Sequence, residues 1–167
     1  NNEISINFDK FFVDDNDFLN DLKGNFIIKN NIVNSGFINA KLNNKNDFNL
    51  NIKTNTKKEK ITNLFIENPS PFIQNFNFIK GFDNGKLSFS SIEKNNLTNS
   101  NLKIYDFKIK EVPVLAKILT LASLQGIADL LTGEGIRFDD FEMDYSSEEK
   151  LTKINEIYAL GPAISIL

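Results

Sequence analysis

The chain has 167 residues, a formal net charge of −3 at pH 7 and 41% hydrophobic residues, among them 16 Phe. This composition supplies the core of one domain and excludes disorder as the global state. The acidic balance and a single arginine, Arg137, argue against a nucleic-acid surface. Because His and Cys are absent, catalysis would have to rely on carboxylates, Lys, Ser and Tyr, and disulfides are excluded.

Apolar and polar residues alternate along most of the first 66 positions, which predicts strands that are buried on one face. Residues 14–22 break this pattern and predict a polar linker or a short helix that ends at Gly24. Asn-rich turns are predicted at 30–31 and at 43–46, where the second turn would close a hairpin. The predicted strands and extended segments are, in chain order, 4–8, 26–29, 38–42, 48–52 and 61–66.

Apolar residues then recur at three- and four-residue spacing, which predicts a short amphipathic helix near 71–79. Asp83-Asn84-Gly85 has the composition of a turn, and a strand through Leu87 and Phe89 would follow it. Lys57, Lys58 and Lys60 flank Glu59 between two alternating segments, so they predict a solvated hairpin loop.

A long helix is predicted at 113–131, because Pro113 suits a first helical position and Gly133 suits the residue just past the end. Its apolar residues fall on nearly every side of the helical wheel, so the helix requires apolar cover all round. Its uncharged stretch, 118–128, is well short of the roughly 20 residues that a membrane span needs.

The alternation changes phase on both sides of this helix. Leu102 and Ile104 are followed by Phe107 and Ile109, and the segment that begins with Ile136 and Phe138 shows the same change. One face of a strand cannot present both sets without an extra residue, so we expect bulges or bends near 105–106 and near 139–140. The predicted fold is therefore mainly β, with a curled antiparallel sheet and one long apolar helix across it.

No sequence motif reaches the level of a catalytic, cofactor or metal site. Asp140, Glu142 and Asp144 would share one face of a strand, but Phe141, Met143 and Tyr145 alternate with them, and this is the ordinary pattern of a half-buried strand. Gly133-Glu134-Gly135 follows the predicted helix rather than opening it, so it predicts a helix stop and not a phosphate loop.

The ordered motifs from Phe107 onward resemble the C-terminal region of the AsmA-like proteins, in particular the large YhdP-type members. Residues 81–87 also resemble the family's segment, although Gly-Gly is more usual there than Asn84-Gly85. The resemblance covers 22–167 and leaves 1–21 as a leading strand and polar linker, and it predicts a fragment of a longer protein. The motifs that carry it are 107–119, 122–127, 130–138 and 159–162.

The resemblance implies a β-rich periplasmic body with a hydrophobic groove, attached to the bacterial inner membrane through an anchor outside this fragment. It implies a non-catalytic role in carrying phospholipid towards the outer membrane, and neither a cofactor nor a nucleic-acid partner is expected. The candidate lipid-facing or groove-core residues are Leu102, Ile104, Phe107, Ile109, Leu115, Ile118, Leu119, Ala122, Ile136 and Phe138.

Two alternatives remain open. The helix at 113–131 either packs on the sheet as ordinary core or lines the groove and touches lipid. The chain as a whole is either a lipid conduit or a structural or assembly factor for outer-membrane components, and a hydrolase is disfavoured by the missing His and Cys.

Overall fold

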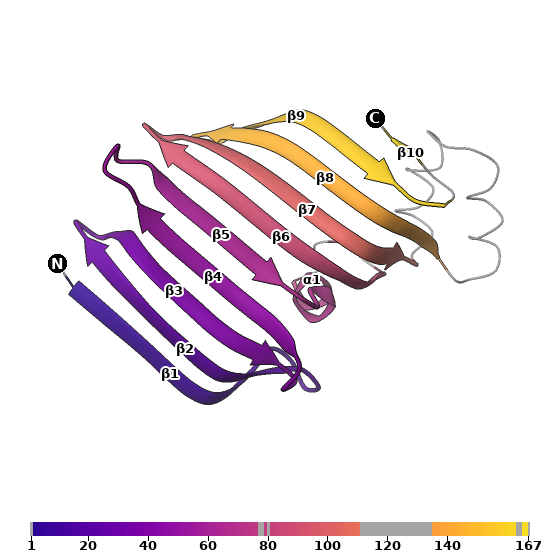
Figure 1. The fold of residues 1–167 in the computed structure, drawn as a ribbon, viewed down its shortest axis with the longest axis horizontal. Helices are drawn as coiled ribbons and strands as arrows, with labels where there is room; N and C mark the ends of the chain where they lie inside the picture. The colour runs from indigo at the N-terminus through magenta and orange to yellow at the C-terminus, as the bar shows by residue number, and fades with distance from the viewer. Residues whose placement is uncertain (1, 77–78, 80, 111–134, 163–164, 167) are drawn as a thin grey trace.

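The fold is mainly β, as predicted, and it is built on a single antiparallel sheet that is not closed. A computed structural model describes residues 2–76, 79, 81–110, 135–162 and 165–166, so the predicted helix at 113–131 lies outside the described residues. The strands lie side by side in chain order, with β1 at one edge and β10 at the other (Figure 1). The elements are β1 (Asn2–Phe12), β2 (Phe18–Lys29), β3 (Ile32–Leu42), β4 (Asn46–Thr54), β5 (Lys60–Ile66), α1 (Ser70–Asn75), β6 (Phe82–Lys94), β7 (Leu97–Ile109), β8 (Ile136–Glu148), β9 (Leu151–Leu160) and β10 (Ser165–Ile166).

Pairs of asparagines make several of the tight turns. Both residues of Asn30-Asn31 and both of Asn95-Asn96 have positive φ, between 51° and 66°. Two successive left-handed residues match the right-handed twist of the flanking strands, and Asn tolerates this conformation better than most residues. The predicted turns at 30–31 and 43–46 are confirmed, and the abundant Asn in this chain has a structural use.

The long connections gather at one end of the sheet, which we call the α1 end. There α1 joins β5 to β6, with Pro71 in its first turn as expected. The short helix predicted near 71–79 is thus confirmed, with its end at Asn75. The opposite end, which we call the hairpin end, carries the tight turns after β2, β4, β6 and β8.

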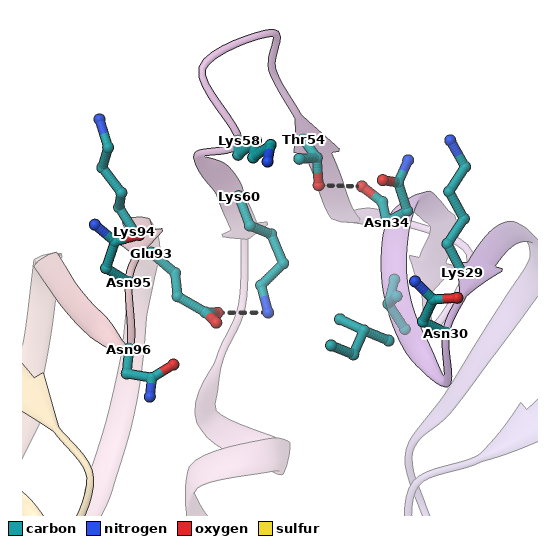
Figure 2. A pocket seen from close by; sticks show the side chains of 12 residues that line it. Lys29, Asn30, Asn34, Thr54, Lys58, Lys60, Glu93, Lys94, Asn95 and Asn96 are labelled. Carbon is teal, nitrogen blue, oxygen red and sulfur yellow. Dashed lines mark hydrogen bonds and ion pairs between the residues drawn. The ribbon is translucent and has the colours of Figure 1, made fainter.

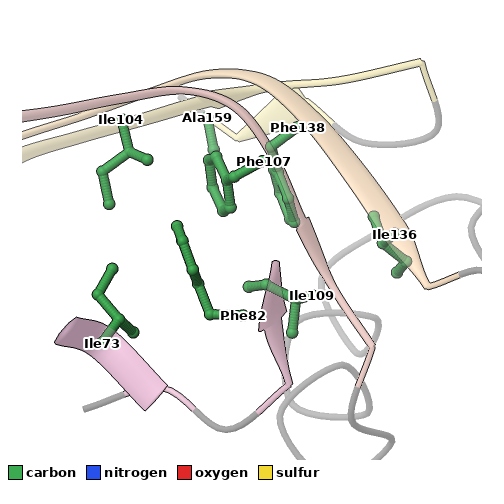
Figure 3. Close-up of a cluster of buried hydrophobic side chains, with 8 residues drawn as sticks. All are labelled: Ile73, Phe82, Ile104, Phe107, Ile109, Ile136, Phe138 and Ala159. Carbon is green, nitrogen blue, oxygen red and sulfur yellow. The ribbon is translucent and has the colours of Figure 1, made fainter. Parts of the chain in front are cut away.

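Two buried clusters form at the α1 end, and α1 contacts both. Ile73 belongs to the larger cluster, and Phe72 packs against the smaller cluster, where its ring lies 5.4 Å from that of Phe48. In Figure 3, β7 and β8 curve around the larger cluster, with Phe82 and Ile73 on the inner side. The larger cluster contains Ile73, Phe82, Ile104, Phe107, Ile109, Ile136, Phe138 and Ala159; the smaller contains Leu19, Leu22, Ala40 and Leu42.

The phase change predicted near 105–106 is present, but an inserted residue does not cause it. Asp106 has a φ of +50°, while the pairing of β7 with β8 keeps one register from Leu97 to Ile109. A left-handed residue therefore turns the following side chains to the same face, so Ile104 and Phe107 are both buried. Near 139–140 β8 also bends without a change of register against β7, so the irregularity there is a bend and not a bulge; a register shift in β8 lies at Asp144/Tyr145, against β9.

Two further expectations differ from the structure. Residues 18–22 belong to β2, and neither a helix nor a linker fills 14–22, because Asp21 with a φ of +48° and a bulge after Asn20 shift the alternation. Residues 21 and 22 both lie in this strand, so the leading segment shares the sheet with the rest of the chain. Asp83-Asn84-Gly85 lies inside β6 rather than in a turn, because its positive φ values bend a continuous strand.

Candidate functional site

The most distinctive surface is a row of apolar residues that crosses all nine long strands. Each member is paired directly with the next, and residues paired in this way point to the same face of a sheet. We call it the central apolar row; it consists of Ile6, Gly24, Ile38, Leu50, Leu64, Phe89, Leu102, Met143 and Ile157.

The central apolar row is half-buried rather than covered. Apart from Gly24, each of its members keeps an intermediate exposure to solvent, whereas the buried clusters lie further toward the α1 end. The neighbouring row on the α1 side is also apolar throughout, from Phe8 through Ile66 to Ala159. The described residues therefore present a broad apolar face, which is covered at one end by α1.

The opposite face of the sheet is mainly polar, although Phe37 and Phe65 are exposed on it. The corresponding row there runs through Ser5, Asn25, Phe37, Asn51, Asn63, Ser90, Asn101, Asp144 and Glu156. A sheet with one solvated face and one apolar face is the common antiparallel pattern, and the apolar face normally packs on something. The apolar face is therefore the candidate functional surface.

On β5 to β7 the apolar face becomes polar toward the hairpin end. One row beyond the central apolar row, Thr62, Ser91 and Ser100 lie side by side, and one row further Lys60 pairs with Glu93. An open pocket of about 370 Å³ lies there, between the turns after β2, β4 and β6 (Figure 2). The pocket is lined by Lys29, Asn30, Ile32, Val33, Asn34, Thr54, Lys58, Lys60, Glu93, Lys94, Asn95 and Asn96.

The sequence-predicted site residues divide into two groups. Six of them come together at the α1 end: Ile104, Phe107, Ile109, Ile136 and Phe138 in the larger buried cluster, and Leu102 packed against it. The other four, Leu115, Ile118, Leu119 and Ala122, lie outside the described residues. The predicted residues thus mark the covered end of the apolar face more than its open part.

Sequence reasoning missed most of the open part. Leu50, Leu64 and Phe89 were recognised as members of strands, but no single strand shows that they lie beside one another. The pocket was missed because Lys58 and Lys60 predicted only a solvated loop. The alternation within each strand shows which of its residues share a face. The pocket, in contrast, is formed by three turns that are distant from one another in sequence.

The carboxylates of β8 lie on the polar face and interact with its other side chains. The Asn101 amide donates to Glu142 at 2.6 Å and to Asp144 at 2.9 Å, and Lys103 forms an ion pair with Glu142 at 2.9 Å. These bonds to Asn101 and Lys103 lower the pKa of the Glu142 carboxyl, and the bond to Glu142 raises the pKa of Lys103. The group ties β7 to β8 on the solvated side.

Within the described ranges, no cluster of His, Cys, Asp or Glu has the arrangement of a metal site. No helix in the same ranges is long and apolar enough to cross a membrane.

Comparisons with known proteins leave the family resemblance as a prediction. No protein-family model matches the chain, and neither curated proteins nor solved structures give a match.

Proposed function

We propose that this chain is a non-catalytic, lipid-carrying β-sheet segment, and that acyl chains lie along its apolar face. The observation that carries the proposal is the central apolar row, which crosses nine strands without a charged residue and remains half-buried. A row of this kind offers a continuous apolar path in one direction across the sheet.

The energetics of lipid transfer explain why such a surface is useful. A two-chain lipid exposes some 30 methylenes in water, which costs on the order of 25 kcal/mol at ~0.8 kcal/mol each. An apolar face of Leu, Ile, Phe and Met replaces water along the route, while the head group stays in solvent. Such a lining needs few placed polar groups, and the central apolar row has none.

The resemblance to AsmA-like, YhdP-type proteins supports the same proposal. The resemblance implies that the chain lies in the periplasm, attached to the bacterial inner membrane through a part of the protein outside this sequence. The cargo would be phospholipid on its way to the outer membrane. In this proposal the apolar face of the curled sheet forms the groove.

Photo-crosslinking tests the proposal with a matched pair of phenylalanines. Phe89 lies in the central apolar row, and Phe65 lies on the opposite face with 39% of its side chain exposed. Benzoyl-phenylalanine at position 89 should capture phospholipid from vesicles, and the same group at position 65 should not. Lipid-free protein at position 89, or equal capture at both positions, would overturn the proposal.

One observation favours the second candidate, a structural or assembly role for outer-membrane components. The edge strand β1 exposes apolar side chains, with Ile4 at 46% and Phe8 at 50%, and edge strands accept other chains by backbone pairing. Benzoyl-phenylalanine at position 8, mixed with an unfolded outer-membrane β-barrel protein, tests this role. Capture of that protein, together with lipid-free position 89, would favour assembly over lipid carriage.

A further inference from the structure

The pocket at the hairpin end contains excess positive charge. Four lysines line it, against one lining carboxylate, Glu93. Lys60 is paired with Glu93 at 2.5 Å, and Lys94 is paired with Glu59 at 2.9 Å. Two of the four lysines therefore have their charge balanced by a nearby carboxylate.

The other two, Lys29 and Lys58, carry the excess. Neither forms an ion pair with a carboxylate in the described part of the chain. Lys29 lies at one side of the pocket, at the end of β2, and Lys58 lies in the turn after β4, the middle one of the three turns (Figure 2). In a protein with a net charge of −3, two lysines that line one pocket without a carboxylate partner there favour an anionic ligand.

The remaining lining suits an anion that carries an apolar group. The side chains of Asn30, Asn95 and Asn96 supply amide donors, while Ile32 and Val33 supply an apolar wall. The pocket volume of about 370 Å³ is that of a small-molecule site and exceeds what one phosphate needs.

Position in the sheet connects the pocket to the apolar face. Lys60 and Glu93 lie on the same face as the central apolar row, because Lys60 is four residues from Leu64 and Glu93 is four residues from Phe89 along their strands. A ligand whose charged end occupies the pocket can lay its apolar end on that face.

We propose that this pocket binds a phosphate group, and that it takes the head-group phosphate of the lipid whose chains lie on the apolar face. This second part rests on the proposed function. The paired Lys60 and Lys94 shape the pocket, and Lys29 and Lys58 supply the charge that an anion neutralises. The lipid then lies with its head group at the hairpin end and its chains toward α1.

Binding to lipids that differ only in the phosphate tests the proposal. Phosphatidic acid and diacylglycerol with the same acyl chains are compared on the wild type, on the double variant Lys29→Gln/Lys58→Gln, and on the control Lys23→Gln/Lys53→Gln. The control removes the same charge from the polar face, where neither lysine lines the pocket. Matching thermal midpoints for the three proteins show that each is folded.

The wild type should prefer phosphatidic acid, and the double variant should lose about tenfold in affinity for it while retaining diacylglycerol binding. The control should keep the wild-type preference. Raising the ionic strength should reduce this preference, because the Debye length falls from about 10 Å at 0.1 M to about 3 Å at 1 M.

Inorganic phosphate distinguishes the two sources of the group. The amide resonances of Asn30, Asn95 and Asn96 are compared in phosphate and in chloride at equal ionic strength. A shift that is specific to phosphate supports the pocket, even if neither lipid binds. Absence of lipid binding together with such a shift would defeat the proposed function but not the phosphate site. Equal affinity for the two lipids, together with no phosphate-specific shift, would overturn the pocket while leaving lipid carriage intact.

Discussion

Phe107 stacks on Phe138 with ring centroids 4.9 Å apart and planes within 10° of each other, at the point where β7 and β8 bend. Phe82 continues the stack on the other side of Phe107, at 5.3 Å. Three strands therefore meet through three rings, and Phe107 is the middle one. The bend holds its shape because it closes over these buried rings.

Truncation of the middle ring should be costly. Phe107→Ala removes a side chain that is 3% exposed and leaves a cavity between two rings, so we expect a loss of about 3–5 kcal/mol in the free energy of unfolding. Urea denaturation measures it. Phe65→Ala, on the polar face, should cost less than about 1 kcal/mol; equal losses would refute the role of the stack.

The left-handed conformation of Asp106 predicts a second effect. A β-branched residue at a φ of +50° is strained, so Asp106→Val should destabilise the chain by about 2 kcal/mol. Asp106→Asn, which tolerates this conformation, should stay within about 0.5 kcal/mol of the wild type. Thermal unfolding compares both with Lys108→Val, two residues along the same strand at an ordinary φ. A neutral Asp106→Val would mean that the bend does not depend on this conformation.

The contact of α1 with the sheet gives a third prediction. Ile73 is 6% exposed and lies in the larger buried cluster, so Ile73→Ala should cost about 2–4 kcal/mol. The matched control is Ile154→Ala in β9, where the side chain is 54% exposed and the loss should be under about 1 kcal/mol. Urea midpoints that move equally would show that α1 adds nothing to the core.

Stability should fall in acid, in part through Glu142. Its pKa is lowered from 4.5 in the folded state, first by the bond from Asn101 and then by the bond from Lys103. Between the folded and the unfolded pKa of Glu142, the unfolded chain therefore binds more protons than the folded protein. The contribution of Glu142 to the stability of the fold is complete above pH 4.5 and is lost as the pH falls through the folded pKa. Urea midpoints measured from pH 6 downward should fall less steeply in Glu142→Gln. Identical slopes would exclude this group as a source of the acid sensitivity.

The strands before residue 66 were predictable because period-two alternation and Asn pairs agree there. Positions 30–31 show this, since both a turn composition and a change of strand direction fall on the same two residues. The bend at Asp106 was predictable in place but not in kind, because an inserted residue and a left-handed residue produce the same change of phase. The turn predicted at Asp83-Asn84-Gly85 was wrong for a related reason, since residues with positive φ occur in a bend within a strand as well as in a turn.

The candidate surface was less predictable than the strands. Ile104, Phe107 and Phe138 could be identified because the apolar alternation of their own strands changes phase. This phase change lies at the α1 end, where the larger buried cluster forms. Leu64 and Phe89 lie side by side only because β5 and β6 adopt one particular register. Register depends on pairing between segments distant in sequence, which alternation within one strand does not specify. β9 was missed because a bulge opposite Asp144/Tyr145 disrupts its alternation.

The pairing order of the strands has a consequence for how the molecule can fold and vary. Each strand from β2 to β9 pairs only with its two neighbours in the chain, so no contact within the sheet must wait for a distant strand to arrive. Loop closure is short at the turns after β2, β4, β6 and β8, which favours growth of the sheet from hairpins. A whole hairpin added or removed at an edge preserves every remaining pair, so the width of the apolar face can change in units of two strands without a new topology.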